Sequence, residues 1–214
     1  MKFIHSVIKI KAMNEGTIPE NKKGVKSDTV SSVELTSTEQ AIQHYERVRN
    51  RFLDVNNWHA YAGVGSAEFT LRNAKGEMIT GQLPQKGNYF EIAIPGPANE
   101  AGEGKDWVQI ADISEISNAD FQCITIKVHP AASPVNNNTE TAHFFDEEAS
   151  STFIIRREGR VVSAEVHGRN ETPNTDEVGL RDKIRNTVVA LGAMLGFSKI
   201  QWKNLTSGLV NAEG

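Results

Sequence analysis

Residues 152–195, TFIIRREGRVVSAEVHGRNETPNTDEVGLRDKIRNTVVALGAML, combine a strand pair with a long helical pattern. Thr152–Arg157 and Val161–His167 are rich in β-branched residues and flank a Glu-Gly-Arg turn, which is typical of a β-hairpin. Asn174 then caps a helix, with Glu177 three residues further on. Apolar residues recur every three or four positions and predict a helix over 175–195: Leu180, Ile184, Val188, Leu191 and Leu195.

Gly196 permits a bend or a stop at the end of this helix. A second apolar stripe then indicates that helix resumes: Ile200, Trp202, Leu205 and Leu209. We therefore expect a C-terminal helical extension after residue 196. Because this stripe adds to the helix already predicted, it could pack on a second subunit, which makes a homodimer one expected partner.

Another helical pattern lies upstream. Ser37 and Gln40 have the spacing of a capping box, and apolar residues at helical spacing follow, so we predict a helix over 38–53. Residues 54–58 break this helix, and residues 29–35 form a β-branched strand before it. Alternation predicts further strands at 67–71, 89–94, 107–110 and 121–128, with a return strand at 78–83. Helices segregated from an antiparallel sheet define the α+β class.

The length of 214 residues lies between that of one domain and that of two. Residues 2–10 alternate like a short strand, and residues 14–27 are polar and contain Gly16, Pro19 and Gly24, which indicates a flexible connector. We therefore predict an N-terminal arm and connector over 1–27 and a single α+β domain over 28–214.

Composition argues against several classes of function. With 23 Lys and Arg against 27 Asp and Glu, the net charge of -4 does not favour nucleic-acid binding. The longest uncharged apolar-rich run, 186–198, is shorter than the ~20 residues that span a bilayer, so no stable membrane insertion is expected. Residues 1–9 lack a signal-peptide pattern, which predicts a cytoplasmic protein. Cys123 stands alone and no Cys/His cluster has zinc spacing, so neither a metal nor a cofactor is predicted.

Side chains of catalytic type gather between the last strand and the long helix. Strand alternation places Glu165, His167, Arg169 and Glu171 on one face. His167 could act as a general base with Glu171 or Asp54 as its partner, and Arg169 could bind a carboxylate or phosphate. The alternative is a capped helix start whose polar groups bind loop backbone, with Arg169 paired to Glu171.

Aromatic residues are candidate walls for an apolar cavity. Trp58 could line such a cavity, with His59 or Tyr61 supplying a polar tip. Trp107 follows the acidic, glycine-rich loop 95–106, which could act as a lid, and Asn170 adds a carboxamide next to Arg169. The alternative for Trp58 is that it packs a helix against the sheet.

The order of elements resembles the START-like, polyketide cyclase/dehydrase superfamily (SRPBCC). The likeness rests on Ser32-Val33-Glu34-Leu35-Thr36 before a helix, on Arg51-Phe52-Leu53-Asp54-Val55-Asn56-Asn57-Trp58 at its end, and on the C-terminal helix. It covers about residues 28–196. The resemblance implies a helix-grip fold, in which a curved antiparallel sheet grips a long C-terminal helix around a deep apolar cavity. Family members bind lipids, sterols, polyketides or aromatic metabolites, and some catalyse cyclisation or hydrolysis. No catalytic residue pattern carries over to this chain.

Three functions follow as expectations. The leading one is the binding of a small apolar or amphipathic ligand in an internal cavity. The expected ligand-binding residues are Trp58, Tyr61, Trp107, His167, Arg169 and Asn170. The second is an enzyme of the cyclase or hydrolase kind with His167 as its acid or base and Glu171 or Asp54 as partner. The third is an interaction module that dimerises through the C-terminal helix.

Overall fold

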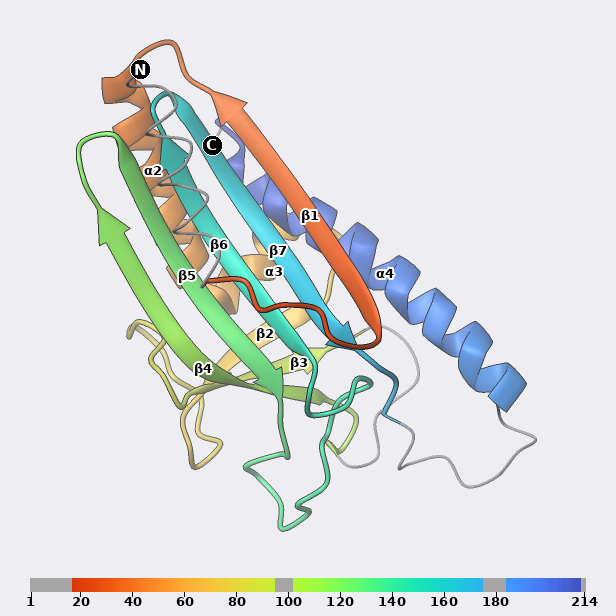
Figure 1. Cartoon of the computed structure of the whole chain (residues 1–214). Helices are drawn as coiled ribbons and strands as arrows, with labels where there is room; N and C mark the ends of the chain where they lie inside the picture. Colours follow the sequence, from red (N-terminus) through yellow and green to blue (C-terminus); the bar gives the residue numbers. More distant parts are fainter. Residues whose placement is uncertain (1–16, 95–101, 175–183, 213–214) are drawn as a thin grey trace.

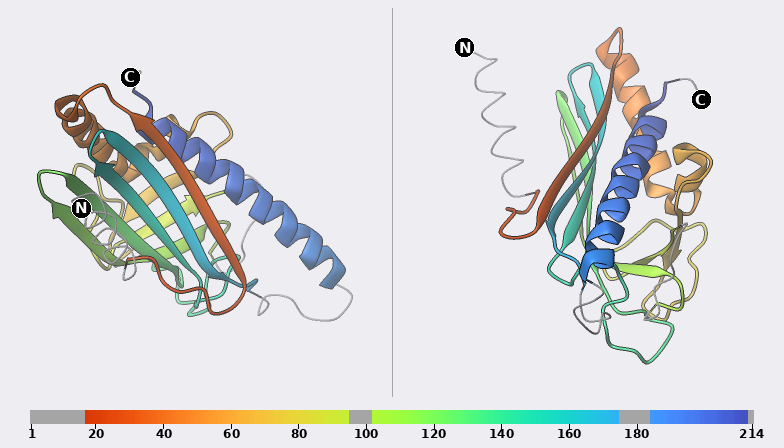
Figure 2. Two further views of the ribbon diagram at one scale, coloured as in Figure 1. Left: turned by 45° about the horizontal axis from the view of Figure 1, so that its top comes forward. Right: turned by 90° about the vertical axis from the view of Figure 1, so that its right-hand side faces the viewer.

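The computed structural model describes residues 17–94, 102–174 and 184–212 (Figure 1). Within these residues, the strands form one antiparallel sheet in the order β1-β7-β6-β5-β4-β3-β2. Their bounds are β1 Val25–Glu34, β2 Glu68–Arg72, β3 Tyr89–Ala93, β4 Asp106–Ser117, β5 Phe121–Pro130, β6 Ser150–Glu158 and β7 Val161–Glu171. Three helices, α2 (Thr38–Leu53), α3 (Trp58–Ala62) and α4 (Ile184–Val210), lie on one face of the sheet (Figure 2). We call this the inner face and the opposite one the outer face. The arrangement confirms the predicted α+β, helix-grip-like fold.

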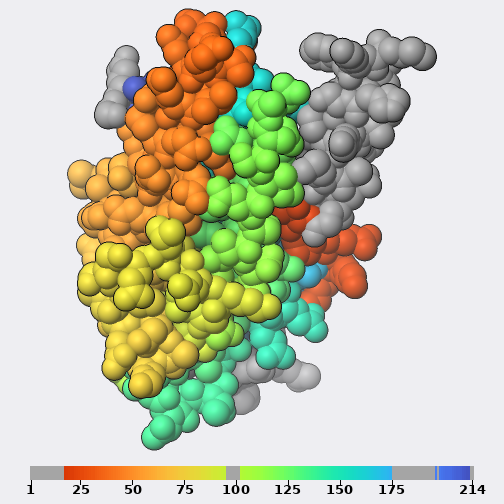
Figure 3. Space-filling model, turned by 90° about the vertical axis from the view of Figure 1, so that its left-hand side faces the viewer, coloured from red at the N-terminus to blue at the C-terminus, as the bar shows by residue number. Residues whose placement is uncertain are grey.

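The first helix has the bounds that the sequence predicts. The Ser37 hydroxyl accepts a hydrogen bond from the backbone N–H of Gln40 at 3.2 Å, as a capping residue should. The helix buries the side of its surface that carries Ala41, Tyr45, Val48 and Phe52. Figure 3 shows α2 beside β4, where the Arg49 guanidinium binds both carboxylate oxygens of Glu115 at 2.7 and 2.8 Å. The predicted break follows as a short 3-10 turn, Val55–Asn57, and then α3.

Most of the predicted strands are present, and several are longer than expected. The hairpin forms between β6 and β7, and it turns at Gly159, whose φ of 56° is one that glycine adopts easily. The segment expected at 107–110 continues to Ser117 in β4. The return strand expected at 78–83 is reduced to an isolated bridge between Arg72 and Met78. The strand expected at 2–10 lies outside the described residues.

The C-terminal helix differs from the prediction. α4 continues through Gly196 to Val210 without a break, and the predicted start at 175–183 lies outside the described residues. Leu205 and Leu209, which were expected to face a second subunit, are 1% and 2% exposed and pack against α2, α3 and the sheet. The segment after 196 is therefore the part of the helix that the sheet grips. A surface for dimerisation through these leucines is absent because they belong to the core.

The first strand also begins earlier than expected. β1 starts at Val25, so the end of the predicted connector is already part of the sheet. The Asn170 side chain accepts hydrogen bonds from the backbone N–H groups of Lys22 at 2.8 Å and Lys23 at 3.3 Å. The division into an arm over 1–27 and a domain over 28–214 stays a prediction.

Aromatic side chains fill most of the space between the sheet and the helices. Trp58 is fully buried, and its ring lies 5.2 to 5.9 Å from the rings of Phe52, Phe69, Phe90 and Phe153. Its indole N–H donates a hydrogen bond to the backbone carbonyl of Phe52 at 2.9 Å. Trp58 therefore packs the helices onto the sheet, as the alternative interpretation expected.

Candidate ligand site

A local irregularity of β7 determines where Glu171 points. Asn170 has a φ of 55°, and the pairing of β1 with β7 shifts register between the pair Ser27–Gly168 and the pair Val25–Glu171. A bulge of this kind adds a residue to one strand and reverses the alternation beyond it. Glu171 consequently lies on the inner face, whereas simple alternation placed it beside His167 on the outer face.

Three features on the inner face accommodate the Glu171 carboxyl group. Gly168 leaves room for it, because a Cβ at that position would lie 2.0 Å from Glu171 Oε1. The Ser27 hydroxyl donates a hydrogen bond to the same oxygen at 3.0 Å. The bulge at Asn170 provides the third feature. Glu171 is only 5% exposed, so these features hold a carboxyl group inside the protein.

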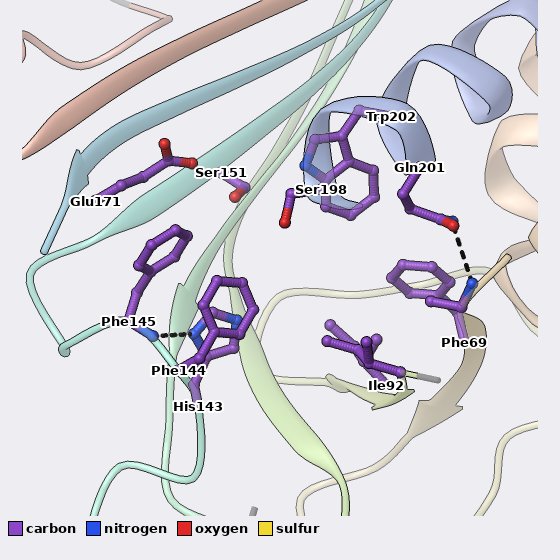
Figure 4. Close-up of a pocket in the computed structure, with 12 residues that line it drawn as sticks. Phe69, Ile92, His143, Phe144, Phe145, Ser151, Glu171, Ser198, Gln201 and Trp202 are labelled. Carbon is purple, nitrogen blue, oxygen red and sulfur yellow. Dashed lines mark hydrogen bonds between the residues drawn. The ribbon is translucent and has the colours of Figure 1, made fainter. Parts of the chain in front are cut away.

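A small pocket lies next to this carboxyl group, between the sheet, α4 and the segment 143–145 (Figure 4). Figure 4 shows Glu171 and Phe145 on one side of the pocket and Phe69, Gln201 and Trp202 on the other. Its volume is about 40 Å³ for the centre of a water-sized sphere, more than the ~10–15 Å³ that one water needs. The lining is mainly apolar: Ala67, Phe69, Ile92, Ile94, His143, Phe144, Phe145, Ser151, Glu171, Ser198, Gln201 and Trp202.

Two polar side chains of the pocket wall are incompletely bonded. Gln201 is 4% exposed, and its Oε1 accepts a hydrogen bond from the Ala67 backbone N–H at 2.9 Å. Within the described part of the chain, the buried Gln201 Nε2 and Glu171 Oε2 have no hydrogen-bond partner. Buried polar atoms without partners are rare in native proteins and often mark a place that water or a ligand occupies.

Burial shifts the pKa of both ionisable groups of the pocket in the direction of the neutral form. Burial raises the pKa of Glu171, and the hydrogen bond from Ser27 and the charge of Arg169 oppose this only in part. Burial lowers the pKa of His143. The Phe145 backbone N–H donates to His143 Nδ1 at 3.0 Å, so the neutral ring carries its proton on Nε2. A carboxyl group of raised pKa in an apolar pocket can accept a hydrogen bond when ionised and donate one when protonated.

A wider cleft between β1 and α4 adjoins this pocket. It is lined by Val25, Lys26, Ser27, Asp28, Thr29, Glu171, Ser198, Lys199 and Trp202 and has a volume of about 250 Å³ by the same measure. Glu171, Ser198 and Trp202 line both spaces, so they form the junction between pocket and cleft. The two volumes together approach the lower end of the ~300–1,000 Å³ of ligand sites in proteins. We call pocket and cleft together the β1–α4 site.

His167, the predicted acid or base, lies on the outer face and is fully engaged there. Its Nδ1 is 2.7 Å from an Asp28 oxygen, and its Nε2 is 2.9 Å from a Glu165 oxygen. One of these contacts joins β7 to β1, and the other lies within β7, so both ring nitrogens are already engaged. The structure does not bring His167 together with Glu171, which lies on the inner face, or with Asp54, which is exposed at the end of α2 and accepts a hydrogen bond from Asn57.

Arg169 and Asn170 also bind their own chain. The Arg169 guanidinium lies 2.7 Å from an Asp28 carboxylate oxygen and donates to the backbone carbonyls of Ser27 and Gly168 at 3.0 and 2.6 Å. The alternative interpretation of this segment expected an ion pair between Arg169 and Glu171, but Arg169 pairs with Asp28 instead. Asn170 binds the 22–23 backbone. His167, Arg169 and Asn170 therefore bond to β1 and to the residues just before it, and Glu171 alone among the predicted residues of this segment lines the β1–α4 site.

The remaining predicted residues lie away from the β1–α4 site. Trp107 is buried against Tyr89 and Ala142, next to the loop whose residues 95–101 fall outside the described range. Tyr61 is half-buried in α3 with the Arg51 guanidinium 5.6 Å above its ring. Neither residue contributes to the pocket or the cleft.

Among the described residues, no group of His, Cys, Asp and Glu has the geometry to hold a metal ion. Cys123 is a free, half-buried cysteine, and burial raises the pKa of its thiol. None of the helices described here combines the length and apolar character of a bilayer span. The cytoplasmic location stays a prediction.

Sequence reasoning missed most of the pocket wall. Trp202 was assigned to a dimer surface, and Gln201, Ser198 and the segment His143-Phe144-Phe145 were not considered as ligand contacts. The adjacent aromatic residues in that segment were a usable signal, because three rings side by side outside a strand indicate a local apolar wall. Gln201 gave no signal, because its burial depends on how α4 meets the sheet.

The sequence matches no family model and no curated protein. Solved structures with a related fold include a hypothetical protein from Helicobacter pylori, with a TM-score of 0.43, 10% identity, and coverage of 90% of this chain and 92% of that one. Norcoclaurine synthase from Thalictrum flavum, in complex with dopamine and hydroxybenzaldehyde, has a TM-score of 0.37 and 6% identity over 89% of this chain and 90% of that one. A di-domain ARO/CYC protein from the steffimycin biosynthetic pathway has a TM-score of 0.37 and 10% identity over 86% of this chain and 51% of that one. At TM-scores below 0.5 these distant likenesses carry no argument about family, ligand or activity.

Proposed function

We propose that the chain binds a small amphipathic molecule in the β1–α4 site. The observation that carries the proposal is the junction itself: a pocket with aromatic walls opens next to a wider cleft that has more polar residues in its lining, and a buried carboxyl group lies where the two meet. Ligand sites in proteins combine an apolar wall with a few placed polar groups in this way.

The site favours an amphipathic ligand over a purely apolar one. The pocket wall offers the rings of Phe69, Phe145 and Trp202, which would remove apolar ligand surface from water at about 25 cal/mol per Å². The cleft adds Thr29, Ser198 and Lys199. A molecule with one apolar and one polar end matches this gradient.

The packed core limits the size of the ligand. Trp58 and the four phenylalanine rings around it occupy the interior that a deep cavity would need. We therefore expect a ligand with the dimensions of a single substituted aromatic ring. Acid–base catalysis by His167 has no support from the geometry, because both of its ring nitrogens are engaged on the outer face.

The proposal can be tested by NMR with toluene as the probe. Because Trp202 lines both spaces, we expect toluene to shift its indole N–H resonance in the wild type. Ser198→Trp would fill the junction and abolish the shift. Ile200→Trp adds the same side chain at a position that is 63% exposed and should leave the shift intact. An unshifted Trp202 resonance in the wild type, or equal shifts in both variants, would contradict a binding site at the junction.

A further inference from the structure

The buried position of the Glu171 carboxyl group is not explained by the contacts described so far, because one of its oxygens has no hydrogen-bond partner in the described structure. Placing a carboxyl group inside a protein without full hydrogen bonding is unfavourable, so the buried position of Glu171 calls for an explanation. Here Gly168 leaves space for the group, Ser27 binds one oxygen, and the bulge at Asn170 turns it inward. We call these three positions, Ser27, Gly168 and Asn170, the seat of the Glu171 carboxyl group, because together they hold it on the inner face.

Within the described residues, no charged side chain binds the second oxygen of Glu171. Arg169, the nearest residue in sequence that could neutralise it, directs its guanidinium to Asp28 and two backbone carbonyls. Lys26 at the mouth of the cleft lies 3.3 Å from the other Asp28 oxygen. Within the described residues, Oε2 of Glu171 is left as a buried acceptor without a donor.

The position of Glu171 relates this missing donor to the β1–α4 site. Glu171 is one of the three residues that line both pocket and cleft, and the Trp202 ring and Ser198 line the same junction from α4. A molecule that places its apolar part against Trp202 and Phe145 would bring its polar end to this carboxyl group. The Gln201 amide, whose Nε2 also lacks a partner, adds a hydrogen-bond donor to the same pocket.

We propose that Glu171 is the recognition group of the β1–α4 site and that the natural ligand presents a hydrogen-bond donor, a hydroxyl or an amine, to this carboxyl group. The inference rests on the function proposed above and adds the chemical class of the ligand.

Three probes of nearly equal shape test whether the preferred donor is a hydroxyl or an amine. Toluene has no hydrogen-bond donor, benzyl alcohol has a neutral one, and benzylamine has a cationic one. Their affinities are measured by isothermal titration calorimetry for the wild type, Glu171→Gln and Glu171→Leu. A hydrogen bond to a charged group typically changes an affinity by about tenfold or more, so we expect at least one donor probe to bind the wild type about tenfold more tightly than toluene.

The two variants identify the group responsible. Glu171→Leu should remove the preference for both donor probes while toluene still binds, which also shows that the variant is folded. Glu171→Gln keeps a carbonyl acceptor, so it should retain a preference for benzyl alcohol and lose any preference for benzylamine. Wild-type selectivity that persists in Glu171→Leu would overturn the inference and leave the proposed function standing. Failure of all three probes to bind the wild type would overturn both.

Discussion

Two glutamates of β7 show how differently one strand treats the same side chain on its two faces. On the outer face, Glu165 accepts hydrogen bonds from Ser163 at 2.9 Å and from His167 at 2.9 Å, and Arg156 lies 3.6 Å away. On the inner face, Glu171 has one bond, from Ser27, and one oxygen without a partner in the described structure. The outer glutamate belongs to a satisfied network, and the inner one does not.

The comparison teaches that a dense polar cluster is weak support for a site. The segment around His167 is rich in residues of catalytic type, but those residues bond to one another and hold edge strand β1 to β7. A polar group that the protein buries and leaves partly unbonded is stronger support, because stability alone does not explain it.

The largest expected difference between the two faces is in stability. Glu165→Gln removes a charge from a network in which the Glu165 side chain is 10% exposed, and breaking a buried ion pair costs about 3–5 kcal/mol in other proteins. We expect a loss of about 2–4 kcal/mol in the free energy of unfolding, measured by urea denaturation. Glu171→Gln is the matched control and should change that free energy little or raise it. Equal losses in the two variants would refute the contrast drawn between the faces.

A smaller loss of stability is expected when a methyl group is added at Gly168, where it would occupy the space of the Glu171 carboxyl group. In Gly168→Ala the added Cβ would lie 2.0 Å from Glu171 Oε1 and 2.3 Å from Ser27 Oγ. Overpacking of this kind costs about 1–3 kcal/mol, which urea denaturation would detect. In a Glu171→Ala background the same change should cost clearly less, because two of the three nearest atoms, Glu171 Oε1 and Cδ, are gone. An undiminished loss there would mean that Gly168 is required for a different reason.

The smallest expected effect concerns the pH dependence of stability: the contributions of Glu171 and Glu165 to the free energy of unfolding should change with pH in opposite directions. Burial raises the pKa of Glu171 above 4.5, so its contribution to stability is present below about pH 4.5 and is lost as the pH rises through the raised value. Burial also acts on Glu165, but the hydrogen bond from His167 and the charge of Arg156 lower its pKa below 4.5. The contribution of Glu165 is therefore present above pH 4.5 and is lost as the pH falls through the lowered value.

The measurement is the unfolding free energy of each Gln variant relative to the wild type between pH 3 and pH 7. The advantage of the wild type over Glu171→Gln should shrink as the pH rises, and its advantage over Glu165→Gln should grow. Parallel curves for the two variants would show that the two carboxyl groups do not differ in environment as described.

Local signals were sufficient for most of the fold. The capping box at Ser37 and the apolar stripe after it predicted the bounds of α2, and β-branched residues around Gly159 predicted the β6–β7 hairpin. Gly196 misled the prediction of α4, because a glycine destabilises a helix by only ~1 kcal/mol and contacts elsewhere in the helix exceed that. Tertiary packing at Leu205 and Leu209 decided the outcome.

The candidate site was less predictable than the fold. Alternation with a period of two placed Glu171 beside His167, and the bulge at Asn170 reversed it. Asn is the residue that most often joins glycine at positive φ, so its presence near the strand end was a weak sign of the bulge. Burial of Gln201 and Ser198 depends on how α4 crosses the sheet, and nothing local in the sequence encodes that.

The close contact between α4 and α3 at Gly208 provides a point about which the long helix could tilt. A Cβ at Gly208 would lie 1.9 Å from the Tyr61 carbonyl oxygen, so the two backbones meet there and fix one point of the helix. At 1.5 Å per residue, Ser198 lies about 15 Å from this point and Leu205 about 4.5 Å. A tilt of about 10° around Gly208 would displace α4 by about 2.5 Å at Ser198 and by less than about 1 Å at Leu205. A small rotation of α4 about Gly208 would therefore change the width of the cleft at Ser198 more than the packing at Leu205.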